Sequence, residues 1–355
     1  MDSSARPSAI PGYEDWPGYV FKNDLVEVPQ RSRQLAEVLG VPAPASNLQI
    51  SRQWRETHDG VTTMALSWQL GFGPETRAWL VVPEGATGPL PGVLALHCHA
   101  GQKYTGASRL ITFPDNQSEP GIETDPARHD LYDGRSAATD LARDGFAVLA
   151  HDTFSWGSRR FSLDTPPEVY NAAAAVHEST IAKAAGLIGT SFAGMVAHDD
   201  LAALSVLESL PEVDASRLGC FGFSGGGGRA LMLAALSPKI RSYAITAMMT
   251  TFSSLLPAYL DAHSWLLQTP GLWKVADWPE LTTHSSAEQF LIQFASRDPL
   301  FPEQGMRDAD KLLNSLHDTG SYTGSFWPVE HRFSADMQRQ VFDFFYKTLG
   351  NEITL

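Results

Sequence analysis

The stretch 222–226, Gly-Phe-Ser-Gly-Gly, decides the fold that we expect for this chain. The apolar run 217–221 before it predicts a buried strand, and the glycines and apolar residues of 227–236 after it predict a helix. A serine on a sharp strand-to-helix turn needs glycines on both sides, because their missing side chains permit the strained backbone. Ser224 is therefore a candidate nucleophile. A phosphate-binding turn is the alternative, but no Lys-Ser/Thr pair follows the glycines.

Runs that predict strands alternate with runs that predict helices along most of the chain. Strands are expected at 61–69, 77–82, 92–96, 146–150, 216–222, 241–247, 290–295 and 322–327, and helices at 31–39, 136–144, 195–210, 308–316 and 335–349. This alternation predicts an α/β fold in which a mostly parallel central sheet carries helices on both faces.

The domain organisation follows from where this alternation begins and where it is interrupted. We expect residues 1–60 to form an N-terminal arm packed on the core, and residues 61–355 to form the main domain. The segments 102–135 and 251–288 do not fit the alternation. They are expected to be insertions at the carboxyl ends of strands, where open α/β sheets bind ligands.

Composition excludes several classes of partner. The formal charge of −14 argues against nucleic acid and against anionic membrane surfaces. The only two cysteines, Cys98 and Cys220, lie in apolar runs, which is typical of buried, reduced thiols. Neither a secretory signal nor an apolar run of membrane-spanning length is visible, so a cytoplasmic protein is expected. The sequence leaves open whether the chain forms a homo-oligomer.

A nucleophilic serine needs a base and an orienting carboxylate, and the chain supplies both after Ser224. Asp298 follows the apolar run 290–295 and precedes prolines, which places it on a loop at the end of a strand. His331 lies on the loop before the last helix. Ser, acid, His is the chain order of the α/β-hydrolase arrangement, in which the histidine deprotonates the serine and the acid holds the other ring nitrogen. A turn-forming Asp and a surface His are the alternative interpretation.

Other acids and one arginine compete for places near this site. Glu330 is next to His331, which makes a pairing between the two awkward, and Asp308 lies inside a predicted helix. Arg229 follows the serine by one helical turn. It either pairs with a carboxylate that holds the turn or faces solvent.

An oxyanion intermediate needs two amide donors. The amide after the serine, that of Gly225, is one, and the loop that follows the strand 92–96 supplies the other. In that loop the amide of His99 is favoured and that of Cys98 is the rival. The pair His97 and His99 could instead chelate zinc, but no third ligand follows at a suitable spacing, so neither a metal nor another cofactor is expected.

Aromatic residues near the expected insertions are candidates for contacting substrate. Trp265 and Tyr259 lie in the segment 251–288, and Trp156 lies in the loop after the strand 146–150. If this segment caps the pocket, such rings favour an apolar or aromatic ester, or a sugar stacked on a ring. The alternative is that the rings belong to the core of a docked segment.

These motifs together resemble the acetyl xylan esterase-like branch of the dienelactone hydrolase family of α/β-hydrolases. The matching segments are 97–101, 152–160, 211–224, 263–272, 298–302 and 331–333. The resemblance implies serine ester hydrolysis by Ser224, Asp298 and His331. Two segments depart from the family pattern: Cys98 stands where glycine is more common, and 284–290 replaces the usual Ala-Pro-Arg-Pro run.

We therefore expect a serine hydrolase that cleaves a small-molecule carboxylic ester (acetyl, aryl or sugar ester) through an acyl-enzyme. The same three residues also serve hydrolases of lactones, amides and carbon–carbon bonds, so these remain alternatives. A non-catalytic binding protein on the same scaffold is a further alternative, although such proteins commonly lack one of the three residues.

Overall fold

A single twisted sheet forms the centre of the molecule. The computed structural model describes residues 8–117, 119, 125–256 and 258–350, and within them the sheet has nine strands in the order β1-β2-β3-β5-β4-β6-β7-β8-β9. The strands are β1 (Ser51–His58), β2 (Val61–Trp68), β3 (Thr76–Pro83), β4 (Leu90–Leu96), β5 (Ala147–His151), β6 (Val213–Phe223), β7 (Ile240–Thr246), β8 (Gln289–Ala295) and β9 (Tyr322–Trp327).

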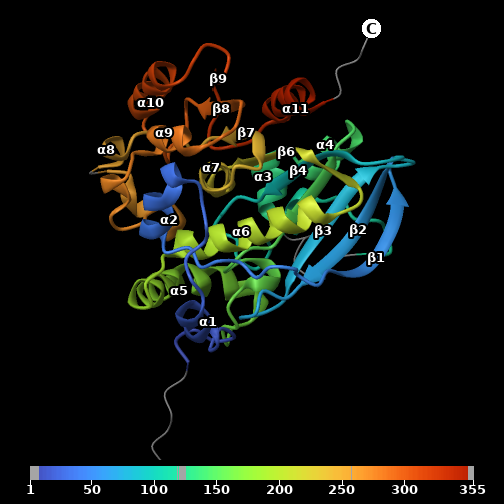
Figure 1. Ribbon diagram of the computed structural model, residues 1–355, viewed down its shortest axis with the longest axis horizontal. Coiled ribbons are helices and arrows are strands. Elements are labelled where there is room, and N and C mark those ends of the chain that lie inside the picture. The colour runs from blue at the N-terminus through green and yellow to red at the C-terminus, as the bar shows by residue number, and fades with distance from the viewer. Residues whose placement is uncertain (1–7, 118, 120–124, 257, 351–355) are drawn as a thin grey trace, which may run out of the picture.

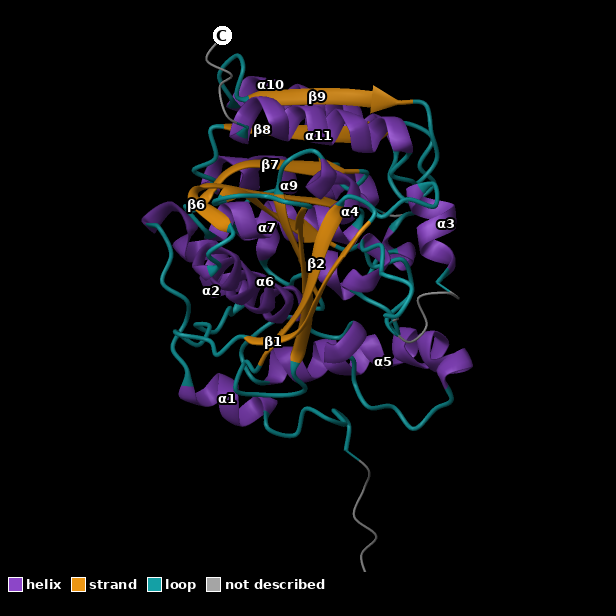
Figure 2. Ribbon diagram, turned by 90° about the vertical axis from the view of Figure 1, so that its right-hand side faces the viewer, coloured by secondary structure: helices purple, strands orange, loops and turns teal. Residues whose placement is uncertain are grey.

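The sheet is antiparallel at one edge and parallel elsewhere. β1, β2, β3 and β5 pair antiparallel in succession, whereas β5, β4, β6, β7, β8 and β9 all run in one direction. Figure 1 shows β1–β3 at one side of the molecule and β8 and β9 at another. Between them the strand direction turns from nearly upright at β2 to nearly horizontal at β9 in Figure 2, which is the twist expected of an open sheet.

Helices cover both faces of this sheet. On β6, Leu218 and Cys220 pack in the cluster that contains α6 (Phe192–Ser209) and α7 (Gly225–Leu236). Phe221 and Phe223 pack in the cluster that contains α4 (Ala137–Arg143) and α11 (Ala335–Leu349). Because successive residues of a strand point to opposite faces, these two clusters lie on opposite sides of the sheet. The predicted α/β class with helices on both faces is confirmed.

The remaining helices include α10 (Glu303–Leu316), whose Met306, Ala309 and Leu313 pack in the same cluster as α6 and α7. The others are α1 (Trp16–Lys22), α2 (Arg33–Leu39), α3 (Pro126–Tyr132), α5 (Pro167–Leu187), α8 (Phe252–Leu255) and α9 (Trp278–Leu281). Short 3-10 helices are η1 (Gln30–Ser32), η2 (Ala107–Leu110), η3 (Gly157–Arg159), η4 (Leu260–Ala262), η5 (Trp265–Leu267), η6 (Leu272–Lys274) and η7 (Thr282–His284).

Much of the expected N-terminal arm packs on the α6–α7 face. The side chains of Tyr13 and Trp16 are fully buried there, and the carbonyl of Leu39 accepts a hydrogen bond from the amide of Ser191 at the start of α6. The sheet, however, begins earlier than residue 61, because β1 pairs with β2 along its whole length. The segment 51–58 is therefore an edge strand of the main sheet.

The two segments that interrupt the alternation hold short helices. The segment 102–135 contains η2 and α3, although part of it lies outside the described residues, and 251–288 contains α8, α9 and η4–η7. Both cysteines are buried and unpaired, as the sequence predicts. Among the described helices no single one is long and apolar enough to cross a membrane; α5 and α6 pass that test only as a pair bent by 84°.

Candidate active site

Ser224 occupies the turn between β6 and α7 in a strained backbone conformation. Its φ is 56° and its ψ is −126°, a backbone region that residues other than glycine rarely adopt. The turn is held because the Ser224 amide donates to the carbonyl of Thr246 on β7 at 2.8 Å. A Cβ on Gly222 would lie 2.1 Å from the carbonyl oxygen of Gly226, so glycine is required for β6 and α7 to approach this closely. The turn therefore presents Oγ at the carboxyl end of the sheet.

The structure brings Ser224, His331 and Asp298 together in a chain of hydrogen bonds. His331 Nε2 lies 2.8 Å from Ser224 Oγ, and His331 Nδ1 lies 2.5 Å from Asp298 Oδ2. Asp298 lies after β8 and His331 between β9 and α11, which are the loops expected from the sequence. Because a carboxylate only accepts, Nδ1 carries the proton and Nε2 is free to accept the serine proton.

Asp298 is itself fixed by its own loop. Its carboxylate is buried, with 6% of the residue exposed, and Oδ1 accepts the amide of Leu300 at 2.8 Å. The ring of Phe223 lies 4.8 Å from the His331 imidazole and limits its movement. The arrangement can therefore transfer a proton from the serine without large rearrangement.

The two amides expected to hold an oxyanion lie next to each other. A Cβ on Gly225 would be 3.1 Å from the amide nitrogen of His99, which places the loop after β4 against the first residue of α7. Within the described chain the His99 amide donates no hydrogen bond. Both backbone groups are thus adjacent to Ser224 at the start of a helix, where developing negative charge is favoured.

The side chains of the two histidines after β4 each contact a different group of the protein. His97 Nδ1 lies 3.0 Å from the carbonyl of Cys98, and His99 Nε2 lies 3.2 Å from Glu178. Burial, together with the guanidinium groups of Arg229 and Arg109, holds the pKa of His97 well below its usual range. No group of three potential metal ligands occurs among the described residues.

Arg229 supports the turn from beneath instead of facing solvent. It forms a buried ion pair with Asp200 on α6 at 2.7 Å and donates to the carbonyl of His97 at 3.1 Å. Burial alone would raise the pKa of Asp200, but the guanidinium and His151 hold it below its ordinary value. One arginine therefore links α6, α7 and the end of β4.

Comparison with known proteins agrees with this geometry. Residues 190–258, which include α6, β6 and Ser224, match the family model of the acetyl xylan esterases. The chain has the α/β-hydrolase fold, and this segment of it is similar to the acetyl xylan esterases. It is also similar to a putative hydrolase, YtaP, of Bacillus subtilis, with 26% identity over 289 residues, 81% of this chain and 87% of that protein.

Solved structures share the fold of this hydrolase at low sequence identity. A putative acetyl xylan esterase from Bacteroides fragilis has a TM-score of 0.65 and 13% identity, and the match covers 84% of this chain and 73% of that one. Acetyl xylan esterase 1 from Thermoanaerobacterium has a TM-score of 0.56 and 15% identity over 95% of both chains. A glucuronoyl esterase from Solibacter usitatus has a TM-score of 0.60 and 12% identity, covering 99% of this chain and 100% of that one.

The segment 251–288 of the hydrolase reaches the nucleophile through η5. The side chain of Leu266 is buried, and its Cδ2 would be 3.0 Å from a Cβ on Gly225. Trp265 is half-buried beside it, and its indole nitrogen lies 3.4 Å from Ser179 Oγ. Tyr259 is also half-buried and packs against the core. The segment therefore approaches the nucleophile turn through Leu266.

Trp156 does not have the substrate-facing place predicted for it. Only 1% of the residue is exposed, and its ring packs against the rings of His99 at 5.2 Å and Phe192 at 5.8 Å. It lies within the core behind the His99 loop. The sequence could not distinguish this position, because an aromatic residue in a loop after a strand suits either place.

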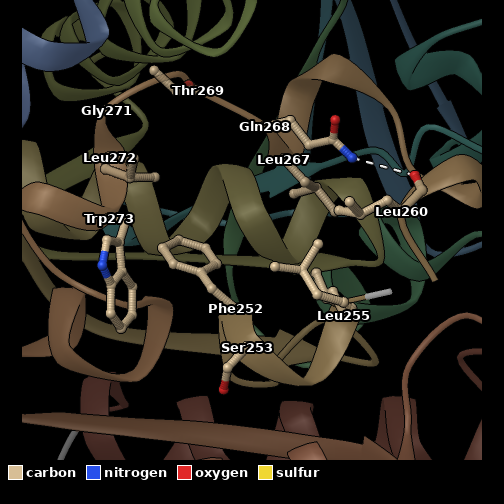
Figure 3. Close-up of a pocket in the computed structure, with 11 residues that line it drawn as sticks. Phe252, Ser253, Leu255, Leu260, Leu267, Gln268, Thr269, Gly271, Leu272 and Trp273 are labelled. Atoms are coloured by element: carbon tan, nitrogen blue, oxygen red, sulfur yellow. Dashed lines mark hydrogen bonds between the residues drawn. The ribbon is translucent and has the colours of Figure 1, made fainter. Parts of the chain in front are cut away.

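The same segment lines an apolar cavity of about 420 Å³ that is open to solvent (Figure 3). Its walls come from α8 and from η4, η5 and η6: Phe252, Ser253, Leu255, Leu256, Leu260, Leu267, Gln268, Thr269, Gly271, Leu272 and Trp273. The side-chain amide of Gln268 donates to the carbonyl of Leu260 at 3.3 Å, which joins η4 to the residue after η5 (Figure 3). Ser224, Asp298 and His331 do not line this cavity.

Two charged residues near the site were missed by sequence reasoning. Lys103 and Glu178 are both buried and form an ion pair at 2.6 Å next to His99. Glu178 lies in a helix that carries several other polar residues, and it is separated from its partners by more than seventy residues of sequence. Nothing local in the sequence marks it, and only the fold brings it to the site.

Proposed function

We propose that Ser224 is the nucleophile of this carboxylic ester hydrolase, that His331 is its general base and acid, and that Asp298 orients His331. The observation that carries the proposal is the continuous chain of hydrogen bonds from Asp298 through His331 to the strained Ser224. The activity itself is supported by the match to the acetyl xylan esterase family across the segment that holds the serine.

The reaction follows in two steps. His331 Nε2 takes the proton of Ser224 as Oγ attacks the ester carbonyl, and the oxyanion is held by the amides of Gly225 and His99. His331 then returns the proton to the leaving alcohol as the carbon–oxygen bond breaks, which leaves an acyl-serine. In the second step water loses a proton to His331 and attacks this acyl group. His331 then gives the proton to Ser224 Oγ as the acyl–oxygen bond breaks, so that the acid is released and Ser224 is restored.

The substrate that we propose is an ester with a small acyl group, such as an acetylated alcohol or sugar. Leu266 Cδ2 would lie 3.0 Å from a Cβ on Gly225, so this side chain stands next to the residue after Ser224 and restricts the space for a long acyl chain. The relatives named as acetyl xylan esterases support the same class. A glucuronoyl esterase shares the fold as well, so the fold alone does not select the acyl group, and Leu266 carries that part of the proposal.

Replacing the nucleophile tests this proposal. Ser224→Ala should reduce the kcat for p-nitrophenyl acetate by about 10⁴-fold or more, because the acyl-enzyme cannot form. Its melting temperature should stay close to that of the wild type. A fluorophosphonate probe should label the wild type at Ser224 and leave the variant unlabelled. Ser315→Ala, at an exposed position of α10, is the matched control and should keep both activity and labelling.

Two results would contradict the proposed function. Undiminished hydrolysis in Ser224→Ala would remove this serine from the mechanism. A different result would favour a binding protein. In that case the wild type would hydrolyse no ester in a panel of acetyl, aryl and sugar esters, and it would not react with the probe.

A further inference from the structure

Glu178 is a buried carboxylate at which three separate segments of the chain meet. It lies in the middle of α5, with 5% of the residue exposed. Its Oε2 lies 3.2 Å from His99 Nε2 and 2.6 Å from Lys103 Nζ. Its Oε1 accepts hydrogen bonds from Ser264 Oγ at 2.6 Å and from the amide of Trp265 at 2.8 Å. The mechanism described above uses none of these contacts directly.

The hydrogen bonds fix the protonation state of His99. The amide of Gly101 donates to His99 Nδ1 at 2.9 Å, so this nitrogen carries a lone pair. The proton is therefore on Nε2, which donates to Glu178. Burial lowers the pKa of His99, and the bond to Glu178 only partly offsets it, so the ring is neutral. Both ring nitrogens are then engaged, and the ring cannot rotate without losing a bond.

Lys103 balances the charge of the carboxylate. Burial alone would raise the pKa of Glu178, but the hydrogen bond from His99 and the charge of Lys103 outweigh it and hold the pKa well below its ordinary value. Lys103 Nζ also donates to Ser155 Oγ at 2.9 Å and lies 4.4 Å from the centre of the Trp156 ring. The pair is thus a fully partnered ion pair inside the protein, which is stable only while both members are present.

The segments that Glu178 joins are the two walls around Gly225. On one side stands His99, whose amide nitrogen would be 3.1 Å from a Cβ on Gly225. On the other stands η5, whose Leu266 would be 3.0 Å from the same atom. Ser264 and Trp265, which Glu178 anchors, directly precede Leu266. A shift of the carboxylate would therefore move both walls.

We propose that Glu178 is a positioning residue, which sets the His99 amide and η5 around the oxyanion site by holding both from one carboxylate. The inference rests on the proposed function, since it assigns Glu178 to the reaction of Ser224. Its charge makes no contact with the reacting atoms. An oxyanion donor acts only when it lies at hydrogen-bond distance from the developing charge, so a displaced His99 amide weakens the transition state more than the bound ester.

The central test compares two identical substitutions on one helix. Glu178→Gln keeps the shape of the side chain. It offers its partners, which are all hydrogen-bond donors, one oxygen and an NH₂ group in place of two carboxylate oxygens. Its kcat for p-nitrophenyl acetate should fall by roughly 10- to 100-fold with KM within about threefold, since loss of a whole oxyanion donor costs about 10²–10³-fold. Glu168→Gln, at an exposed position near the start of α5, should leave both constants unchanged. Rates are normalised to active sites titrated with a fluorophosphonate.

A second measurement separates positioning from a loss of stability. The double variant Lys103→Met/Glu178→Gln removes the buried charge left without a partner, so it should recover melting temperature relative to Glu178→Gln. Its kcat should stay low, because the anchor of His99 is still missing. If kcat recovers together with melting temperature, Glu178 has only a structural role and the inference is wrong.

A milder variant covers the case in which Glu178→Gln does not fold. Ser264→Ala removes one donor from the η5 side and leaves the bond to His99 in place. It should lower kcat by a few-fold without raising KM; an unchanged kcat in this variant overturns the link to η5.

The two proposals fail in different ways. If the wild-type protein neither hydrolyses esters nor reacts with the fluorophosphonate, the proposed function is wrong. If the wild type is active and Glu178→Gln has the same kcat per labelled site, only the inference on Glu178 is wrong.

Discussion

Single glycines determine how closely the strand, the nucleophile turn and the following helix approach each other. A Cβ on Gly226 would lie 2.1 Å from the carbonyl oxygen of Leu96, a backbone atom at the end of β4 that cannot move away cheaply. Gly226→Ala should therefore lower the free energy of unfolding by about 1–3 kcal/mol or more, as expected of an overpacked core. Urea unfolding of the purified variant measures this loss.

Gly186→Ala provides the matched control for this prediction. Gly186 also lies in a helix, α5, but nothing would lie within 4 Å of an added Cβ. Alanine there should leave the protein equally stable or stabilise it by roughly 0.4–1 kcal/mol. If both substitutions have the same effect, close approach is not the reason for glycine at position 226.

The roles of some single residues could be predicted from the sequence, and those of others could not. Ser224, Asp298 and His331 could be located because each follows a recognisable strand, and the order of the three types is itself informative. Glu178 could not, because its function depends on donors from loops that are distant in sequence. Trp156 was placed wrongly, because composition does not tell whether an aromatic ring in a loop faces the pocket or the core.

Among the elements, the buried strands and the amphipathic helices were predictable, whereas β1 and α5 were not. β1 is polar at every position except Trp54, so its apolar content is too low to predict a strand; pairing with β2 stabilises it. α5 is rich in alanine and carries Glu, His and Lys, so it lacks a continuous apolar face. Both elements depend on tertiary contacts more than on their own pattern.

η5 is the element on which we expect acyl-chain selectivity to depend. Leu266→Ala removes the side chain that stands next to Gly225 and should open space next to Ser224. The ratio of kcat/KM for p-nitrophenyl hexanoate to that for the acetate should rise by about tenfold or more, since one methylene in an apolar pocket is worth roughly 10- to 200-fold. Steady-state kinetics on the acetate, butyrate and hexanoate esters measure the ratio.

The control for η5 is Leu256→Ala, a leucine of the same segment that is 60% exposed. It should leave the selectivity unchanged. A wild-type enzyme that already prefers long acyl chains would contradict the small acyl site, whatever the effect of Leu266→Ala.

For the whole molecule, burial of histidines connects folding to pH. Burial is the main cause that lowers the pKa of five histidines: His97, His99, His263, His284 and His317. In the unfolded chain each returns to about 6.5. Below that pH the unfolded chain binds protons that the folded protein does not, so stability falls as pH falls. The carboxylates of Glu178, Asp199 and Asp200, whose pKa values are lowered, extend the loss to more acidic pH.

The free energy of unfolding should therefore decrease between pH 7 and pH 5, by up to about 1.4 kcal/mol per pH unit for each imidazole that stays neutral. Urea unfolding at pH 7, 6 and 5 gives this slope. His97→Gln should reduce this slope by the equivalent of nearly one proton taken up on unfolding. The reason is that His97 is 2% exposed and its Nε2 lacks a partner within the described chain. His129→Gln, whose side chain is 89% exposed, should leave the slope unchanged. A flat profile in the wild type, or equal slopes in the two variants, would mean that buried imidazoles do not set the acid stability of this hydrolase.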